Sequence, residues 1–272
     1  MPPDPQILAR ELSAAFANRR LTPTPSSRYP DFDLASAYAV ERELVRQRQA
    51  DGHAPVGRKV GYANKAVWRM LKLDTVLWAH VYDDTVQYAR AGEAALSIAR
   101  LTAPKIEPEI VVKLKGAARP FDGGSPDAAA ALDACEWIAL GFEVIDCVFP
   151  DWQFQPADFV AAYGLHAALI VGDPRPIDAT MLDALPRFTV RLLKDGQLAA
   201  EGSGRNVLRS PAACLAELAA AATRAPHAEP LAAGEIISTG TTTESQRIAA
   251  GETWTAELDG LALPSLTVRV TV

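Results

Sequence analysis

The sequence predicts an α+β protein with a mixed or antiparallel sheet. Apolar residues first recur at helical spacing, and short β-branched runs replace this pattern from about Val76. Few helical segments separate these runs, whereas a doubly wound α/β fold would alternate strands and helices regularly. We therefore expect a helical N-terminal portion over residues 1–75 and a β-rich core over 76–272, joined as one continuous structural unit.

Two amphipathic helices are expected near the start of the chain. The first lies within about residues 5–20, and the second follows a proline-rich connector at 21–30. Gly52 and Pro55 end the second helix. Asn64 can cap a short third helix that holds Val67, Met70 and Leu71. The apolar stripes of the first two helices are Ile7, Leu8, Leu12, Ala15 and Phe16, and Leu34, Ala37, Val40, Leu44 and Val45.

The later part of the chain is typical of strands. Asp195-Gly196 is a strong signal for a two-residue hairpin. Ser210 as N-cap and Pro211 in the first turn predict a helix that runs to about Thr223. Strict alternation at the end of the chain predicts a half-buried strand. The expected strands include residues 78–82, 105–115, 138–148, 165–171 and 266–272.

Composition narrows the class of protein. The 272 residues carry a net charge of −6 and a pI near 5.3, which argues against nucleic acid or an anionic membrane as a partner. Cys135, Cys147 and Cys214 are scattered and odd in number, so we expect reduced, buried thiols. The sequence begins without a signal-peptide pattern and contains no apolar run long enough to span a bilayer. A cytoplasmic location is the expectation.

Two glutamates in one β-branched run are the first candidate for chemistry. Glu107 and Glu109 flank Pro108, and in an extended strand they point to the same face. Half-buried acids repel each other unless a cation or hydrogen bonds compensate, and Mg²⁺ or Mn²⁺ favours such oxygens. The alternative is a solvated face of a one-sided sheet. Pro108 cannot donate a ladder hydrogen bond, so this strand should be irregular or lie at an edge.

A third acid follows in another β-branched run. Glu143 interrupts Phe142–Asp146, and Asp146 faces the opposite side. Three carboxylates with open positions for water or substrate are how proteins usually hold Mg²⁺. The alternative for Glu143 is a structural ion pair with an arginine.

Four further segments contain candidate functional groups. Lys59 lies between Gly57 and Gly61, where it is either an anion anchor, a general acid or a solvated charge at a strand edge. The loop Thr239-Gly240-Thr241 ends a predicted strand, and its backbone N–H groups and hydroxyls suit a carboxylate. Asp84 follows a strand, as a base, a water-positioning acid or part of a turn. His166 is either a catalyst or a satisfied core histidine. No nucleophile motif accompanies these groups.

In order and spacing, these segments resemble the fumarylacetoacetate hydrolase superfamily, and within it the branch of 2-oxopent-4-enoate hydratases and 4-oxalocrotonate decarboxylases. The resemblance covers most of the chain. Its motifs are Gly57–Gly61, Tyr82–Asp84, Ile106–Ile110, Phe142–Asp146 with Asp151-Trp152, Gly202–Leu208 and Gly234–Gly240.

The resemblance implies a β-rich core of mixed sheets forming a roll or sandwich, and a Mg²⁺ or Mn²⁺ ion held by Glu107, Glu109 and Glu143. Lys59 matches the active-site lysine, and Thr239-Gly240-Thr241 would lie against the substrate carboxylate. The implied enzyme is a lyase in the breakdown of aromatic compounds, acting on a small 2-oxo or 2-hydroxydienoic acid through a metal-bound enolate. Homo-oligomers and association with a pathway enzyme are also implied.

The sequence departs from the family pattern at Tyr163–Ala167, where small hydroxylated residues are expected. His166 is therefore either a new acid/base or a new polar contact. Two alternatives stay open on the same fold: a C–C bond hydrolase of an acylpyruvate-like diketo acid, and a non-catalytic partner subunit. The second alternative predicts loss of the metal ligands, yet the three acids and Lys59 are present.

Overall fold

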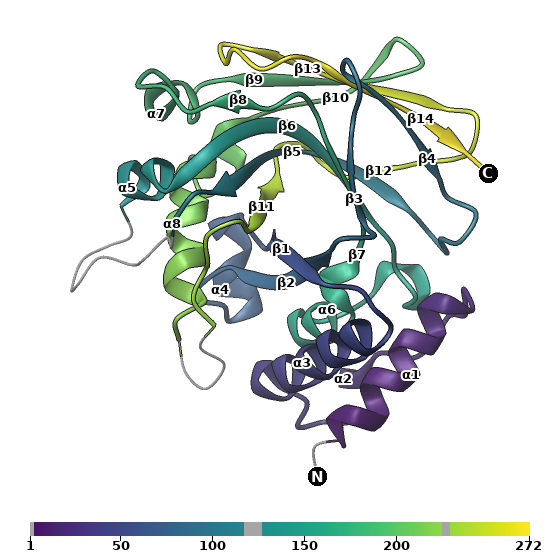
Figure 1. Cartoon of the computed structure of the whole chain (residues 1–272). Helices are drawn as coiled ribbons and strands as arrows, with labels where there is room; N and C mark the ends of the chain where they lie inside the picture. Colours follow the sequence, from purple (N-terminus) through teal and green to yellow (C-terminus); the bar gives the residue numbers. More distant parts are fainter. Residues whose placement is uncertain (1–2, 117–126, 225–228) are drawn as a thin grey trace.

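The computed structural model describes residues 3–116, 127–224 and 229–272, and confirms the predicted α+β class. Two β-sheets form the body of the protein, and a group of helices from the N-terminal end covers one edge of the larger sheet (Figure 1). The C-terminus lies on the smaller sheet, at the opposite end of the molecule from the N-terminus (Figure 1). Among the described residues, no helix combines the length and apolar character needed to cross a bilayer.

The N-terminal helices α1 (Pro5–Ala17), α2 (Pro25–Arg28) and α3 (Leu34–Ala50) begin at side-chain caps. Asp4, Thr24 and Asp33 each accept a backbone N–H of the first turn. The first helix is shorter than expected, and the proline-rich connector contains α2. The predicted apolar stripes of α1 and α3 pack with α6 (Pro156–Ala161) into a separate core, whose members include Leu8, Leu12, Val40, Leu44, Phe149 and Val160. Ile7, which was predicted in the stripe of α1, is instead 57% exposed.

The larger sheet has the order β2-β1-β11-β5-β6-β7-β3, with β12 paired to β5 and β8 paired to β6. Its strands are β1 (Pro55–Gly61), β2 (Leu77–Tyr82), β3 (Val86–Tyr88), β5 (Lys105–Leu114), β6 (Cys135–Ile145), β7 (His166–Val171), β8 (Arg175–Pro176), β11 (Ile236–Thr241) and β12 (Gln246–Arg247). The residues of β1 fall within 1–75, the predicted helical N-terminal portion, but their hydrogen bonds place β1 inside this sheet, between β2 and β11.

The smaller sheet has the order β10-β9-β13-β14-β4. Its strands are β4 (Glu93–Ser97), β9 (Thr189–Lys194), β10 (Gln197–Ser203), β13 (Thr253–Asp259) and β14 (Leu266–Thr271). The hairpin predicted at Asp195-Gly196 is confirmed, because these two residues join β9 to β10. The strand predicted at the end of the chain is β14, which pairs with β13 and β4.

Short helices fill the connections: η1 (Lys65–Val67), α4 (Trp68–Leu71), α5 (Ala128–Asp133), η2 (Pro150–Trp152), η3 (Tyr163–Leu165), α7 (Met181–Ala184), η4 (Gly204–Asn206) and α8 (Pro211–Ala221). Asn64 caps η1 as predicted, by accepting the N–H of Ala66. Ser210 occupies the predicted N-cap position of α8, but its hydroxyl forms no capping hydrogen bond. The start of the helix is therefore confirmed, and the side-chain cap is not.

Pro108 lies inside the sheet and not at its edge, because β5 is flanked by β11 and β6. The expected irregularity is in the partner strand: the register of β11 against β5 shifts between Ser238 and Thr241. The carbonyl of Pro108 accepts the backbone N–H and the hydroxyl of Thr242, 3.0 and 2.7 Å away. The side of Pro108 that lacks a donor therefore faces this break in the ladder.

A buried charge network ties α3 to β2. The two ring nitrogens of His80 contact Glu41 at 2.7 Å and Glu229 at 3.1 Å. Burial alone would lower the pKa of His80, but the carboxylates of Glu41 and Glu229 raise it to about 9. Arg58 adds the second cation of the network, 3.6 Å from Glu229. The network is therefore charged at neutral pH.

Candidate metal centre

The three predicted acids lie together on the larger sheet. Glu107 on β5 is directly opposite Glu143 on β6, and Glu109 is two residues further along β5 on the same face. One carboxylate oxygen from each lies within 4.8 Å of the others. Opposite Glu109 stands Gly141, so no side chain of β6 separates the acids there.

The surroundings of the acids disfavour three negative charges. Glu109 is 1% exposed and Glu143 is fully buried. Burial raises the pKa of Glu107 to about 7 and that of Glu109 well above its ordinary range, and the neighbouring acids add to this. One oxygen of Glu109 accepts the Ser238 hydroxyl and the Gly240 N–H, at 2.6 and 2.8 Å. The other oxygen, Oε1, is buried without a partner.

Lys59 reaches this group from β1. Its ammonium lies 2.9 Å from Glu143 and donates to the carbonyl of Gly164 at 3.0 Å. Burial disfavours the charged lysine, but Glu143 and the two other glutamates outweigh this and raise the pKa of Lys59. Two strands separate β1 from β6 in the strand order. The sheet must therefore curl to bring Lys59 to Glu143, as the ribbon shows (Figure 1).

The backbone before His166 is specialised. Tyr163, Gly164 and Leu165 all have positive φ values, between 57° and 60°. A Cβ at Gly164 would lie 2.9 Å from Cδ of Lys59 and 2.8 Å from Cβ of Ala79, so only glycine fits against the lysine. This turn presents the Gly164 carbonyl to Lys59 and starts β7 at His166.

His166 lies behind Glu143. Its Nδ1 is 3.0 Å from a Glu143 oxygen, and its Nε2 is 2.9 Å from the Thr85 hydroxyl. Burial alone would raise the pKa of Glu143, but Lys59 and His166 hold it below its ordinary value. The sequence prediction left His166 as a catalyst or a polar contact, and the contacts observed are to a predicted metal ligand and to Thr85.

A cavity of about 410 Å³ opens over the acids. Lys59, Glu107, Glu109, Gly240 and Thr241 line it. Its walls also include the apolar residues Ile145, Trp152, Phe154, Phe159 and Leu165. Of the predicted carboxylate loop, Thr239 differs from its neighbours, because its hydroxyl donates to the carbonyl of Ile110 at 2.8 Å. Gly240 and Thr241 are thus the two loop residues at the cavity.

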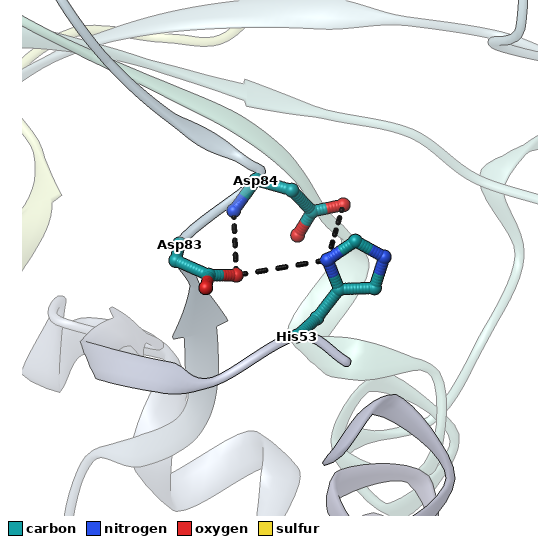
Figure 2. A group of neighbouring side chains, drawn as sticks. All are labelled: His53, Asp83 and Asp84. Carbon is teal, nitrogen blue, oxygen red and sulfur yellow. Dashed lines mark hydrogen bonds and ion pairs between the residues drawn. The ribbon is translucent and has the colours of Figure 1, made fainter. Parts of the chain in front are cut away.

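Asp84, predicted as catalytic, belongs to a different cluster. Figure 2 shows Asp83 and Asp84 facing the imidazole of His53, with oxygens 3.7 and 3.6 Å from Nδ1. Asp84 also pairs with Arg48. It lines a second cavity of about 670 Å³, as His166 does, and is not among the residues that line the cavity over the acids. The structure therefore does not bring Asp84 to the three glutamates.

Three contributors to the site escaped the sequence analysis. Ser238 holds Glu109, Thr85 contacts His166, and Asn206 lines the cavity while donating to the carbonyl of Thr242 at 2.7 Å. Ser238 directly precedes the predicted loop on β11 and could have been included with it. Asn206 lies within the Gly202–Leu208 motif, but no role was assigned to it there. Thr85 carried no local signal, because its partner His166 lies far away in the sequence.

The donor set suits a hard divalent cation. Carboxylate oxygens are the ligands that Mg²⁺ and Mn²⁺ favour. The partnerless, buried Oε1 of Glu109 and the raised pKa values of Glu107 and Glu109 show that compensation by protein groups alone is incomplete. A bound cation would supply the missing positive charge.

The fold and this acid cluster define a β-rich protein with a carboxylate site of the kind that holds a metal ion. A family model for the fumarylacetoacetate (FAA) hydrolase C-terminal domain matches residues 78–271. The chain belongs to this family, as the resemblance in its sequence predicted.

Two hydratases are similar to this protein over most of the chain. A 2-hydroxyhexa-2,4-dienoate hydratase of Comamonas testosteroni is 28% identical over 257 residues, 94% of both proteins. A 2-hydroxypent-2,4-dienoate hydratase of Pseudomonas putida is 31% identical over 216 residues, covering 78% of this chain and 92% of the relative. Among solved structures, 4-oxalocrotonate decarboxylase from Pseudomonas putida G7, complexed with magnesium and adipate, is similar with a TM-score of 0.86. It is 26% identical, and the match covers 98% of this chain and 97% of that one.

Proposed function

We propose that this protein is a divalent-metal-dependent lyase acting on a small 2-oxo or 2-hydroxydienoic acid, as a hydratase or a decarboxylase. The observation that carries the proposal is the grouping of Glu107, Glu109 and Glu143 with Lys59, beside a cavity that Lys59, Glu107 and Glu109 line. The similarity to two dienoate hydratases and a decarboxylase supports the same class of reaction. We also propose a place for this reaction in the breakdown of aromatic compounds.

The residues proposed to hold the metal are Glu107, Glu109 and Glu143. When bound, Mg²⁺ or Mn²⁺ would supply a Lewis acid for the carboxylate and 2-oxo oxygens of the substrate. The magnesium in the similar decarboxylase structure supports this choice of ion. Ser238 and Gly240 would keep Glu109 in place, since both already hold its Oε2.

Lys59 is the proposed catalytic residue. Its ammonium is buried, points at the acids and lines the cavity. It would hold the proton exchanged with the substrate, or neutralise the negative charge that develops on the substrate oxygen. Gly240 and Thr241 would contact the substrate carboxylate, because both line the same cavity.

His166 is proposed as a positioning residue. It contacts Glu143 and is absent from the residues that line the cavity, so it would orient this carboxylate as a second layer around the metal. The hydrolase alternative depended on His166 as a base beside the substrate. This placement gives that alternative no support, and we do not propose hydrolysis.

We also propose that the protein is cytoplasmic and forms a homo-oligomer, which associates with an enzyme of the same pathway. The three free, buried cysteines suit a reducing compartment. Light scattering on the purified chain tests the oligomer: a mass of 29.1 kDa would refute it.

A product assay tests the reaction. Purified protein with Mg²⁺ is given 2-hydroxypenta-2,4-dienoate in one experiment and 4-oxalocrotonate in another. A hydratase consumes the first by adding water and releases no CO₂, whereas a decarboxylase releases CO₂ from the second. Lys59→Met should lower either rate at least about a hundredfold. Lys113→Met, which removes an ion-paired lysine of another strand, β5, should leave the rate unchanged. Turnover of neither compound by the metal-loaded protein would refute the proposal.

A further inference from the structure

Lys105 places a second positive charge at the cavity, apart from Lys59. It is the first residue of β5 and lies on the same face as Glu107, two residues away. This spacing corresponds to about 7 Å along the strand. Lys105 and Glu107 both line the cavity over the acids, and Lys105 is half-buried there. The cavity therefore has an acidic end, where a metal would bind, and a cationic end.

Lys105 lacks a direct ion-pair partner in the described part of the protein. Across residues 3–116, 127–224 and 229–272, no carboxylate forms an ion pair with its ammonium. Lys59, in contrast, is paired with Glu143. The residue opposite Lys105 in the sheet is Arg247 on β12, which adds positive charge to this end. Glu107 attracts Lys105 through space but does not pair with it directly, so the ammonium in this partly closed cavity keeps its hydrogen-bond donors for an anion.

Trp152 holds Lys105 at the cavity. The lysine Nζ lies 3.9 Å from the centre of the tryptophan ring, a cation–π contact. Asp151 and Trp152 have φ values of 54° and 58°, which non-glycine residues rarely adopt. This unusual backbone places the ring beside the lysine and in the wall of the cavity. The contact restrains the flexible side chain and leaves its hydrogen-bond donors available.

We propose that Lys105 binds a carboxylate at the far end of the substrate, so that the protein selects dicarboxylic over monocarboxylic 2-oxo or 2-hydroxydienoic acids. The inference rests on the proposed function, which places the 2-oxo-acid end at Glu107, Glu109 and Glu143. Lys105 and Glu107 line the same cavity, so a diacid bound through its 2-oxo-acid end at the glutamates can extend toward Lys105. The apolar side chains of Ile145 and Phe154 in the cavity wall suit its hydrocarbon middle.

The test compares two unreactive ligands that differ only at the far end. The affinities of 2-oxoadipate and 2-oxohexanoate for the Mg²⁺-loaded full chain are measured by calorimetry. The diacid should bind about ten- to a hundredfold more tightly, the effect of one charge-assisted hydrogen bond. Lys105→Met should bring this ratio close to one, and Lys105→Arg should keep most of it. Lys113→Met is the matched control, because Lys113 lies on the same strand and pairs with Glu136; it should keep the full ratio.

The outcomes separate this inference from the proposed function. If both ligands bind the wild-type protein equally, or if Lys105→Met keeps the preference, the role of Lys105 is refuted and the proposed function stands. If neither ligand binds, the proposed function fails, and the role of Lys105 fails with it. Thermal melting of each variant shows whether a lost ratio reflects unfolding.

Discussion

Glu109→Gln should uncouple the stability of the protein from magnesium. The substitution keeps the size of the side chain, and its carbonyl oxygen can still accept the bonds from Ser238 and Gly240. It removes one of the three charges proposed to hold the ion. Without metal, the variant should be at least as stable as the wild type, because burial and the adjacent acids raise the pKa of Glu109 and make its charge costly.

The size of the effect follows from binding linkage. At a Mg²⁺ concentration a hundredfold above Kd, binding stabilises the wild type by about 2.7 kcal/mol. For a chain of this size, each kcal/mol raises Tm by about 2–4 °C, so the expected wild-type shift is about 5–10 °C. If Glu109→Gln weakens binding about a hundredfold, the same Mg²⁺ concentration equals its Kd and stabilises it by only about 0.4 kcal/mol, or about 1 °C.

Differential scanning fluorimetry with and without Mg²⁺ measures these shifts. The matched control is Glu136→Gln, which removes an exposed carboxylate from the adjacent strand β6, where Glu136 pairs with Lys113. It should keep the full wild-type shift. A wild-type protein that Mg²⁺ does not stabilise, or a Glu109→Gln variant with an undiminished shift, would contradict the assignment of the metal site.

Three further outcomes are expected. His166→Ala should weaken Mg²⁺ binding about ten- to a hundredfold by releasing the glutamate that it orients, and a normal affinity in titration calorimetry would refute its positioning role. His80 has a folded pKa of about 9, raised above its unfolded value near 6.5. Its contribution of about 3 kcal/mol to the free energy of unfolding is therefore complete below pH 6.5 and disappears as pH rises through 9. Urea unfolding of wild type and His80→Asn across this window should show the loss of stability in the wild type only. Gly164→Ala should lower the free energy of unfolding by about 1–3 kcal/mol and displace Lys59. Gly196→Ala, at a positive φ with no neighbour within 4 Å, should lower it by about 1 kcal/mol. Equal losses of stability in urea unfolding would exclude the proposed clash at Gly164.

Local pattern was sufficient for many of the elements. The stripes of α1 and α3, the cap at Asn64 and the hairpin at Asp195-Gly196 each depend on residues a few positions apart. The same holds for Glu107 and Glu109, which share a face because strand side chains alternate. Boundaries were less exact. Leu165, expected in a strand, belongs to η3, where a run of positive φ values interrupts the extended chain.

The sequence by itself determined the α+β class and the residue types of a carboxylate metal site. Only the tertiary structure decided how these residues meet: Glu143 comes opposite Glu107 through strand register, and the curled sheet brings Lys59 to Glu143. It also placed His166 behind the acids and Asp84 at a separate cavity. The physical reason is how far apart in the sequence the interacting residues lie. Face and cap follow from neighbours in the chain, whereas register and curvature follow from the packing of strands that are distant in sequence.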